Sequence, residues 1–145
     1  PVMMRRLLVP LAAAALAAPA ALAQRGDRPR GPQAADSLIA LAQHTARLGD
    51  TSRALELLEG ATRAAPEYAP AFYQRGVLLS RASRLGFGDV MQRRSAGNQL
   101  ERALQLDPDN PRYLVELGRL RLKTPFLRID AERLFSRALK AAQRS

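Results

Sequence analysis

The chain has 145 residues, of which 47% are hydrophobic and 25% charged, a balance typical of one soluble globular unit. It contains no cysteine, which excludes disulfide bonds, thiolate metal sites and a cysteine nucleophile. Aromatic residues make up only 5%, so an aliphatic helical core and an all-α fold are favoured. The net charge of +10 suits an acidic partner, nucleic acid or an anionic membrane, although a GC-rich genome would also produce such an arginine-rich chain.

Residues 1–23 are predicted to form a secretory signal peptide. Two arginines precede an apolar run, residues 7–23, which ends in the small-residue sequence ALA before Gln24. Two prolines interrupt this run, and it is shorter than the ~20 residues that a transmembrane helix needs. We therefore expect cleavage near Ala23 and a periplasmic or secreted mature protein.

Residues 24–34, QRGDRPRGPQA, are predicted to be a disordered linker. They are rich in proline, glycine and arginine and have no hydrophobic period. A basic tether of this kind can also contact an anionic envelope surface. A basic, envelope-associated helical protein is therefore one alternative for the function.

Residues 35–145 repeat one hydrophobic spacing. The pattern Ala-x3-[Leu/Phe]-x2-Ala begins at Ala54, at Ala96 and at Ala131, and it places its three members on one face of a helix. A further helix with its own apolar stripe precedes each of these. The first two patterns reach a proline at the same distance, Pro66 and Pro108, and proline stops one helix and starts the next. The predicted unit is a helix–turn–helix hairpin.

These hairpins resemble the tetratricopeptide repeat family, whose unit of about 34 residues has small residues at fixed helix positions. At one such position the three copies carry Ala42, Gly76 and Gly118, the glycines allowing close helix approach. The resemblance implies a right-handed α-solenoid of about three repeats, residues 35–68, 69–110 and 111–145. In the third we expect Thr124 to be the N-cap of the last helix. A generic helical bundle is the alternative.

The second repeat carries an insertion near residues 84–95. Its sequence SRLGFGDVMQRR has two glycines, but it lacks the preceding strand and the lysine of a phosphate-binding loop. We expect Gly86 and Gly88 to end one helix and Asp89 to cap the next, with the extra length divided between helix and loop. The candidates for a second contact patch are Phe87, Met91, Arg93 and Arg94.

The resemblance also implies a protein-interaction role, with an extended peptide in the concave groove lined by the first helices. A lysine and an asparagine that bind a C-terminal carboxylate in the family are replaced here by Ile39 and Gln43. The lining contains four cations and no acid, which predicts an acidic or extended peptide partner; an ordinary solvated basic face is the alternative. The implied lining residues are Ile39, Gln43, Arg47, Tyr73, Ser80, Arg81, Val115, Arg119 and Lys123.

The inventory of catalytic residues is thin. His44 is the only histidine, so neither a catalytic triad nor a histidine-rich metal site can be assembled. We predict no enzyme activity and no cofactor, and no nucleic-acid-binding motif is present. A second alternative is that the chain is the N-terminal repeat region of a larger exported protein whose activity lies in a missing C-terminal domain.

Overall fold

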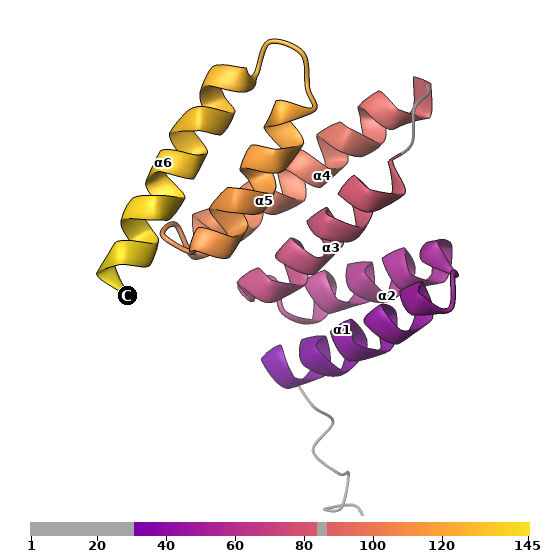
Figure 1. The fold of residues 1–145 in the computed structure, drawn as a ribbon. Coiled ribbons are helices and arrows are strands. Elements are labelled where there is room, and N and C mark those ends of the chain that lie inside the picture. Colours follow the sequence, from indigo (N-terminus) through magenta and orange to yellow (C-terminus); the bar gives the residue numbers. More distant parts are fainter. Residues whose placement is uncertain (1–30, 84–86) are drawn as a thin grey trace, which may run out of the picture.

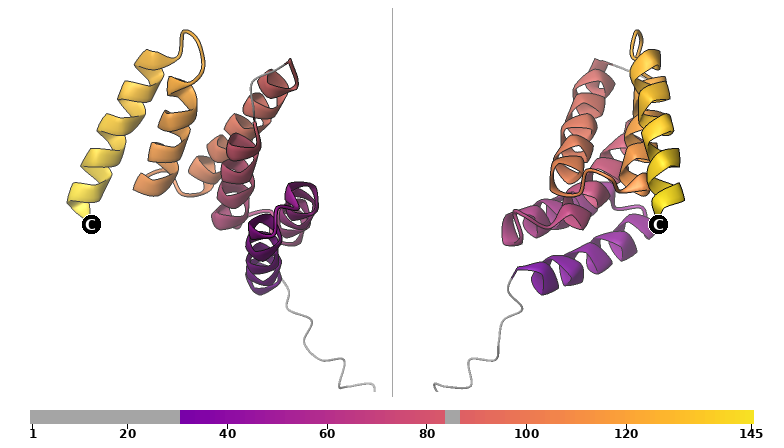
Figure 2. Two further views of the ribbon diagram at one scale, coloured as in Figure 1. Left: turned by 45° about the vertical axis from the view of Figure 1, so that its right-hand side comes forward. Right: turned by 90° about the vertical axis from the view of Figure 1, so that its left-hand side faces the viewer.

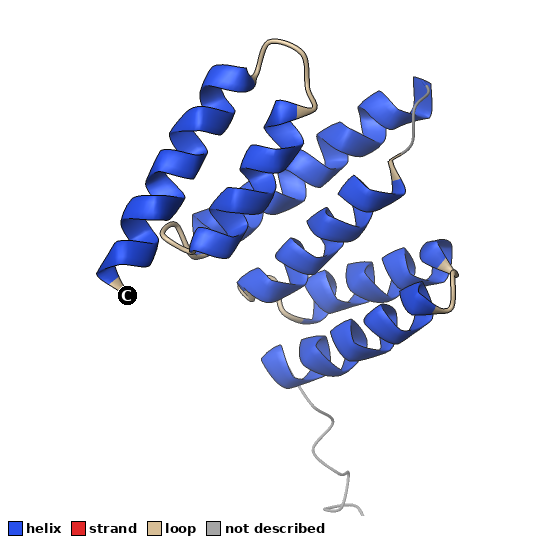
Figure 3. Ribbon diagram, viewed as in Figure 1, coloured by secondary structure: helices blue, strands red, loops and turns tan. Residues whose placement is uncertain are grey.

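The computed structural model describes residues 31–83 and 87–145, and within them it contains six α-helices and no strand (Figure 3). The all-α prediction and the prediction of three helical hairpins are confirmed. The predicted signal peptide and most of the predicted linker lie outside the described residues. None of the six helices combines the length and apolarity that crossing a bilayer requires. The helices are α1 (Pro32–Arg47), α2 (Thr51–Ala64), α3 (Ala69–Ala82), α4 (Phe87–Leu106), α5 (Pro111–Leu122) and α6 (Arg128–Arg144).

The six helices form an α-solenoid of three stacked hairpins, α1–α2, α3–α4 and α5–α6 (Figures 1 and 2). Within each hairpin the two helices pack along one another, and α2 packs on α3 as α4 packs on α5. The first helices also meet, α1 with α3 and α3 with α5, whereas α2, α4 and α6 do not contact one another over the described residues. The first helices therefore line the inner, concave side of the stack.

Each hairpin begins where the sequence offers a good helix start. A proline lies in the first turn of α1, α3 and α5, where its missing N–H loses no helical hydrogen bond. α1 thus begins at Pro32, three residues before the predicted start of the repeats. Asp50 caps α2 by accepting the Arg53 N–H at 3.0 Å, and the Asn110 side chain caps α5 by accepting the N–H groups of Arg112 and Tyr113.

Replacing Asn110 with alanine is expected to lower the free energy of unfolding by about 1 kcal/mol, because two amide groups at the start of α5 lose their acceptor. Urea denaturation followed by circular dichroism measures the change. Asp109→Ala is the matched control, since Asp109 is exposed and is not the capping residue. Equal effects of the two substitutions would show that the cap contributes nothing.

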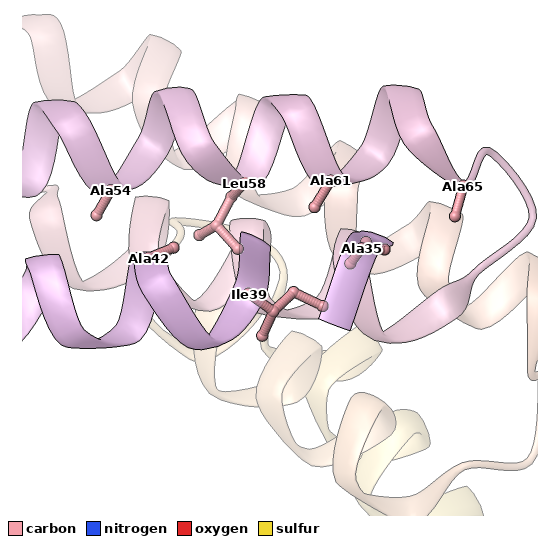
Figure 4. Packing of buried hydrophobic residues seen from close by; sticks show 8 residues of the cluster. Ala35, Ile39, Ala42, Ala54, Leu58, Ala61 and Ala65 are labelled. Carbon is pink, nitrogen blue, oxygen red and sulfur yellow. The ribbon is translucent and has the colours of Figure 1, made fainter. Parts of the chain in front are cut away.

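Small residues form most of the core between α1 and α2 (Figure 4). The alanines that recur at helical spacing are almost fully buried, and they let the two helices approach around Ile39 and Leu58. Equivalent clusters lie between the later hairpins. Leu100 and Leu114 are the largest side chains that are fully buried among the described residues. The alanine-rich pattern of the sequence is thus the helix-packing surface. The buried alanines of the first hairpin are Ala35, Ala42, Ala54, Ala61 and Ala65.

Two glycines mark the closest helix contacts, as the spacing predicts. A Cβ atom at Gly76 would lie 2.7 Å from Leu100 Cγ, and one at Gly118 would lie 2.6 Å from Phe135 Cε1. Both distances are shorter than the ~3.5 Å at which carbon atoms attract each other. Ala42 occupies the equivalent position in the first hairpin and is 1% exposed.

The insertion in the second repeat is mostly helix. α4 has 20 residues where α2 has 14, and α3 ends at Ala82 because Ser83 already has an extended backbone. The expectation that Gly88 ends α3 is therefore wrong, because Gly88 lies within α4, and Gly86 lies outside the described residues. Asp89 is not the N-cap either. It lies in the first turn of α4, where a negative charge interacts favourably with the positive end of the helix dipole. Its relative exposure is only 6%.

The turn between α5 and α6 also differs from expectation. Thr124 does not cap α6, because its hydroxyl donates to the Leu120 carbonyl at 3.0 Å and so closes the end of α5. α6 begins only after Leu127. In between, Phe126 has a φ of 67°, a left-handed conformation that costs a non-glycine residue about 1–2 kcal/mol, and its side chain is fully exposed.

Candidate functional site

A groove of about 900 Å³ opens on the concave side, between the first helices of the three hairpins. Leu58 of α2 and Val77 of α3 contribute to its apolar floor. The polar lining side chains come from all three hairpins, so the groove exists only when the repeats stack. These side chains are Gln43 and Arg47 of α1, Gln74 and Arg81 of α3, and Arg112, Glu116 and Arg119 of α5.

The charge of the groove is strongly positive. Four arginines line it against one carboxylate, that of Glu116. Arg119 Nη1 lies 3.5 Å from Glu116 Oε2, so this pair is partly neutralised. Within the described residues, no ion pair engages the other three arginines, Arg47, Arg81 and Arg112. On the second helices, by contrast, Arg53 and Arg63 each pair with a glutamate of their own helix.

Two stacked tyrosines join α3 and α5 beside the groove. The ring centroids of Tyr73 and Tyr113 lie 4.7 Å apart with an interplanar angle of 27°, an arrangement that favours aromatic attraction. Tyr73 lines the groove, while Tyr113 is buried. Burial raises the pKa of both phenols above the ordinary value of 10.0. Tyr73 therefore offers a guest an aromatic surface held from behind by its partner ring.

The stability of the protein is expected to fall as the pH rises above about 10. The tyrosines of the unfolded chain lose their protons at the ordinary pKa of 10.0, whereas Tyr73 and Tyr113 hold theirs to higher pH when folded. The contribution of these two phenols to the free energy of unfolding is therefore complete below the ordinary pKa. It is lost as the pH rises through their raised pKa in the folded protein. Urea unfolding at about pH 9 and about pH 11 tests this. The Tyr73→Phe, Tyr113→Phe double variant should lose less stability over this range; an unchanged slope would contradict the assignment.

A second hollow, of about 700 Å³, continues the groove toward the C-terminal ends of α3 and α5. It shares Arg81, Glu116 and Arg119 with the main groove, and it adds the hydroxyl groups of Ser80 and Ser83 and the ammonium of Lys123. Three cations thus surround this end of the groove with one acid among them. The result is a continuous path that combines an apolar floor with several cations.

The structure places most of the residues expected to line the groove together. Six of them, Gln43, Arg47, Tyr73, Arg81, Val115 and Arg119, line the main groove. Ser80 and Lys123 line the adjoining hollow. Ile39 is an exception, because it is only 8% exposed and belongs to the core between α1 and α2.

Three polar lining residues, Gln74, Arg112 and Glu116, were not predicted from the sequence. Arg112, Val115, Glu116 and Arg119 follow a spacing of three and four residues, which places them on one face of α5. From this spacing, Arg112 and Glu116 could have been placed beside the predicted lining residues of α5. The expectation that no acid lines the groove is wrong, because Glu116 lies on this same face.

The candidate contact patch of the insertion lies apart from the groove. Met91 is 69% exposed, and Arg94 lines a separate hollow of about 330 Å³ between α4 and the end of α5. Arg93 is engaged with the backbone, since its Nη1 donates to the Lys123 carbonyl at 3.5 Å. The side chain of Phe87 lies outside the described part of the chain.

His44 and Asp107, whose side chains are of kinds used in catalysis, lie in different parts of the described structure. His44 is exposed in the last turn of α1. Asp107 accepts a hydrogen bond from the Asn110 amide in the turn before α5. Across residues 31–83 and 87–145, no three His, Asp or Glu side chains are grouped so that they could hold a metal ion.

Solved structures of MamA, a protein that contains tetratricopeptide repeats, have a similar arrangement of helices. One crystal structure of MamA aligns with a TM-score of 0.63 at 19% identity, over 77% of this chain and 60% of that chain. The chain has a tetratricopeptide-repeat-like fold. A second MamA structure aligns with a TM-score of 0.61 at 19% identity, over 76% of this chain and 55% of that one. The chain thus spans somewhat over half of these MamA chains, and at this identity the likeness concerns the fold. No protein-family model and no curated protein sequence matches the chain.

Proposed function

We propose that this chain is an exported protein-interaction module that binds an acidic, extended peptide segment in the basic concave groove. The observation that carries the proposal is the set of groove arginines without an acidic partner in the described structure, Arg47, Arg81 and Arg112, next to the apolar floor. Elsewhere several arginines pair with glutamates, among them Arg53, Arg63 and Arg75. A carboxylate-bearing guest would supply the missing counter-charges.

Two kinds of contact would bind a peptide in the groove, ion pairs and apolar packing. Exposed ion pairs contribute about 0.2–1 kcal/mol each and weaken with salt, so the arginines select and steer the guest. Burial of apolar side chains against Tyr73, Val77 and Leu58 supplies the rest. The expected guest therefore has acidic residues at the end that meets Arg81, Arg119 and Lys123, and apolar residues in its middle.

A panel of synthetic peptides tests this proposal. Fluorescence anisotropy is measured for an extended peptide with an apolar centre and an acidic end, for its scrambled sequence, and for a version in which lysine replaces each acid. Tightest binding of the first peptide, weakening as salt is added, is expected. Equal binding of the acidic and lysine versions would contradict the proposal.

A further inference from the structure

Exposed apolar side chains are concentrated at one edge of the solenoid. Among the described residues, eight large hydrophobic side chains are exposed. Five of them fall in two short segments, residues 90–91 at the start of α4 and residues 122–129 around the turn from α5 to α6. We call these five residues the turn edge: Val90, Met91, Leu122, Phe126 and Ile129.

The two segments of the turn edge lie beside each other. Arg93 at the start of α4 donates to the Lys123 carbonyl at 3.5 Å, and Val90 lines the same hollow as Thr124 and Pro125. Figure 1 shows the start of α4 and the turn from α5 to α6 on the same side of the molecule. The exposed apolar groups are therefore one surface feature and not scattered residues.

Phe126 is the most prominent member of the turn edge. Its relative exposure is 102%, so the rest of the protein covers almost none of its surface. Its φ of 67° is a conformation that glycine would adopt without strain. The chain thus holds a phenyl ring in solvent on a strained backbone, an arrangement that points to a role outside the fold.

The charge around the turn edge is positive. Arg94, Lys123 and Arg128 are exposed there. Asp89 is buried, Asp130 pairs with Arg133, and Glu132 pairs with Arg128. Arg94 and Lys123 are therefore the two of these cations that no ion pair engages in the described structure. The turns of the opposite edge differ, since those before α3 and α5 carry the exposed acids Glu67, Asp107 and Asp109. That edge is of mixed charge, because the guanidinium groups of Arg102 and Arg137 reach the carbonyls of Pro66 and Pro108 in those turns.

We propose that the turn edge docks on an anionic lipid surface. Phe126, with Val90, Met91 and Ile129, enters the interfacial layer, while Arg94, Lys123 and Arg128 approach the lipid phosphates. A lipid surface fits better than a protein partner because Phe126 protrudes from a turn and presents apolar groups ringed by cations, which suits a deformable, negatively charged plane. This surface adjoins the groove at Leu122 and Lys123, which also line the hollow that continues it, and it does not include the predicted linker, residues 24–34.

The test uses a tryptophan as a depth probe in the full chain, which has no tryptophan of its own. Phe126→Trp is compared with Leu139→Trp, a control position that is 62% exposed on α6. Vesicles of phosphatidylcholine alone, and of phosphatidylcholine with phosphatidylglycerol, are added. The proposal predicts a blue shift of emission and quenching by brominated lipid at position 126 with the anionic vesicles, and little change at position 139. Because both probes are in the same chain, attachment through residues 1–30 alone would not produce this difference.

Two further variants make the outcome decisive. In the Phe126→Trp chain, Arg94→Glu with Arg128→Glu should remove most of the blue shift, whereas Arg53→Glu with Arg63→Glu, an equal change of charge on α2, should not. Phe126→Gly should unfold at the same or a higher temperature, which shows that the fold does not need the ring. No shift at position 126, or equal shifts at positions 126 and 139, would overturn the proposal and favour a protein partner for this edge.

Discussion

Replacing Leu100 with alanine is expected to lower the free energy of unfolding by about 2–5 kcal/mol, which is the usual cost of emptying a fully buried leucine site. Leu100 is 0% exposed and lies in the cluster that joins α3, α4 and α5. Its loss therefore weakens the packing within the second hairpin and the contact with the third. Urea denaturation of the wild type and the variant measures the effect. A cost below about 1 kcal/mol would show that the helices are not packed around this residue.

The contact between Leu100 and Gly76 gives this prediction a second test. Gly76→Ala alone is expected to cost about 1–3 kcal/mol, because the new Cβ would lie 2.7 Å from Leu100 Cγ. In the Leu100→Ala background the same substitution should cost much less, since the obstructing atoms are gone. Gly60→Ala is the matched control, with only an ordinary 3.6 Å contact to Leu38 Cδ1, and helix propensity should make it neutral or stabilising. Equal effects at Gly76 and Gly60 would contradict the close approach of α3 and α4.

Reversing three cations of the groove, in the variant Arg81→Glu, Arg119→Glu, Lys123→Glu, is expected to weaken binding of the acidic peptide roughly hundredfold, because each change removes one attraction and adds one repulsion. Fluorescence anisotropy at low salt measures the loss. The fold should persist, since all three side chains are exposed.

A charge-matched variant separates this effect from the net charge of the protein. Arg53→Glu, Arg63→Glu, Arg133→Glu changes the charge equally but on α2 and α6, away from the groove. It should keep most of the affinity. Equal losses in both variants would mean that the peptide binds the whole basic protein and not the groove.

The spacing of small residues made the fold predictable from the sequence. Ala54, Ala96 and Ala131 mark the second helix of each hairpin, and Gly76 and Gly118 mark the places where helices touch. This pattern can be recognised in the sequence because only small side chains fit at each of these positions. Many residues along the chain carry the same periodicity.

The local turn structure was less predictable, because one side chain can make competing hydrogen bonds. Thr124 has the chemistry of an N-cap for α6, yet its hydroxyl bonds the last turn of α5. Asp89 likewise fits an N-cap, but α4 begins before it and leaves it within the first turn. Sequence alone does not say which of two adjacent helix ends such a residue serves.

The groove was predictable in outline and not in its detail. The helix face that carries Arg119 and Val115 follows from the repeat spacing, but whether Ile39 lies in the groove or in the core depends on how α1 rotates against α2. Glu116 was missed for a similar reason: the family positions select individual residues, while the whole face of α5 lines the groove. Counting charges only at the family's groove positions therefore left out the one acid that lines the groove, Glu116.

Peptide binding in the concave groove is tested most directly by locating a bound acidic peptide on the solenoid. A spin label on the peptide broadens the nuclear magnetic resonance signals of amides close to it. Binding in the groove predicts broadening along α1, α3 and α5, near Arg47, Arg81 and Arg119. The signals of α2 and α6 near Arg53 and Arg133 should be unaffected. Broadening confined to the second helices, or spread evenly over the protein, would contradict it.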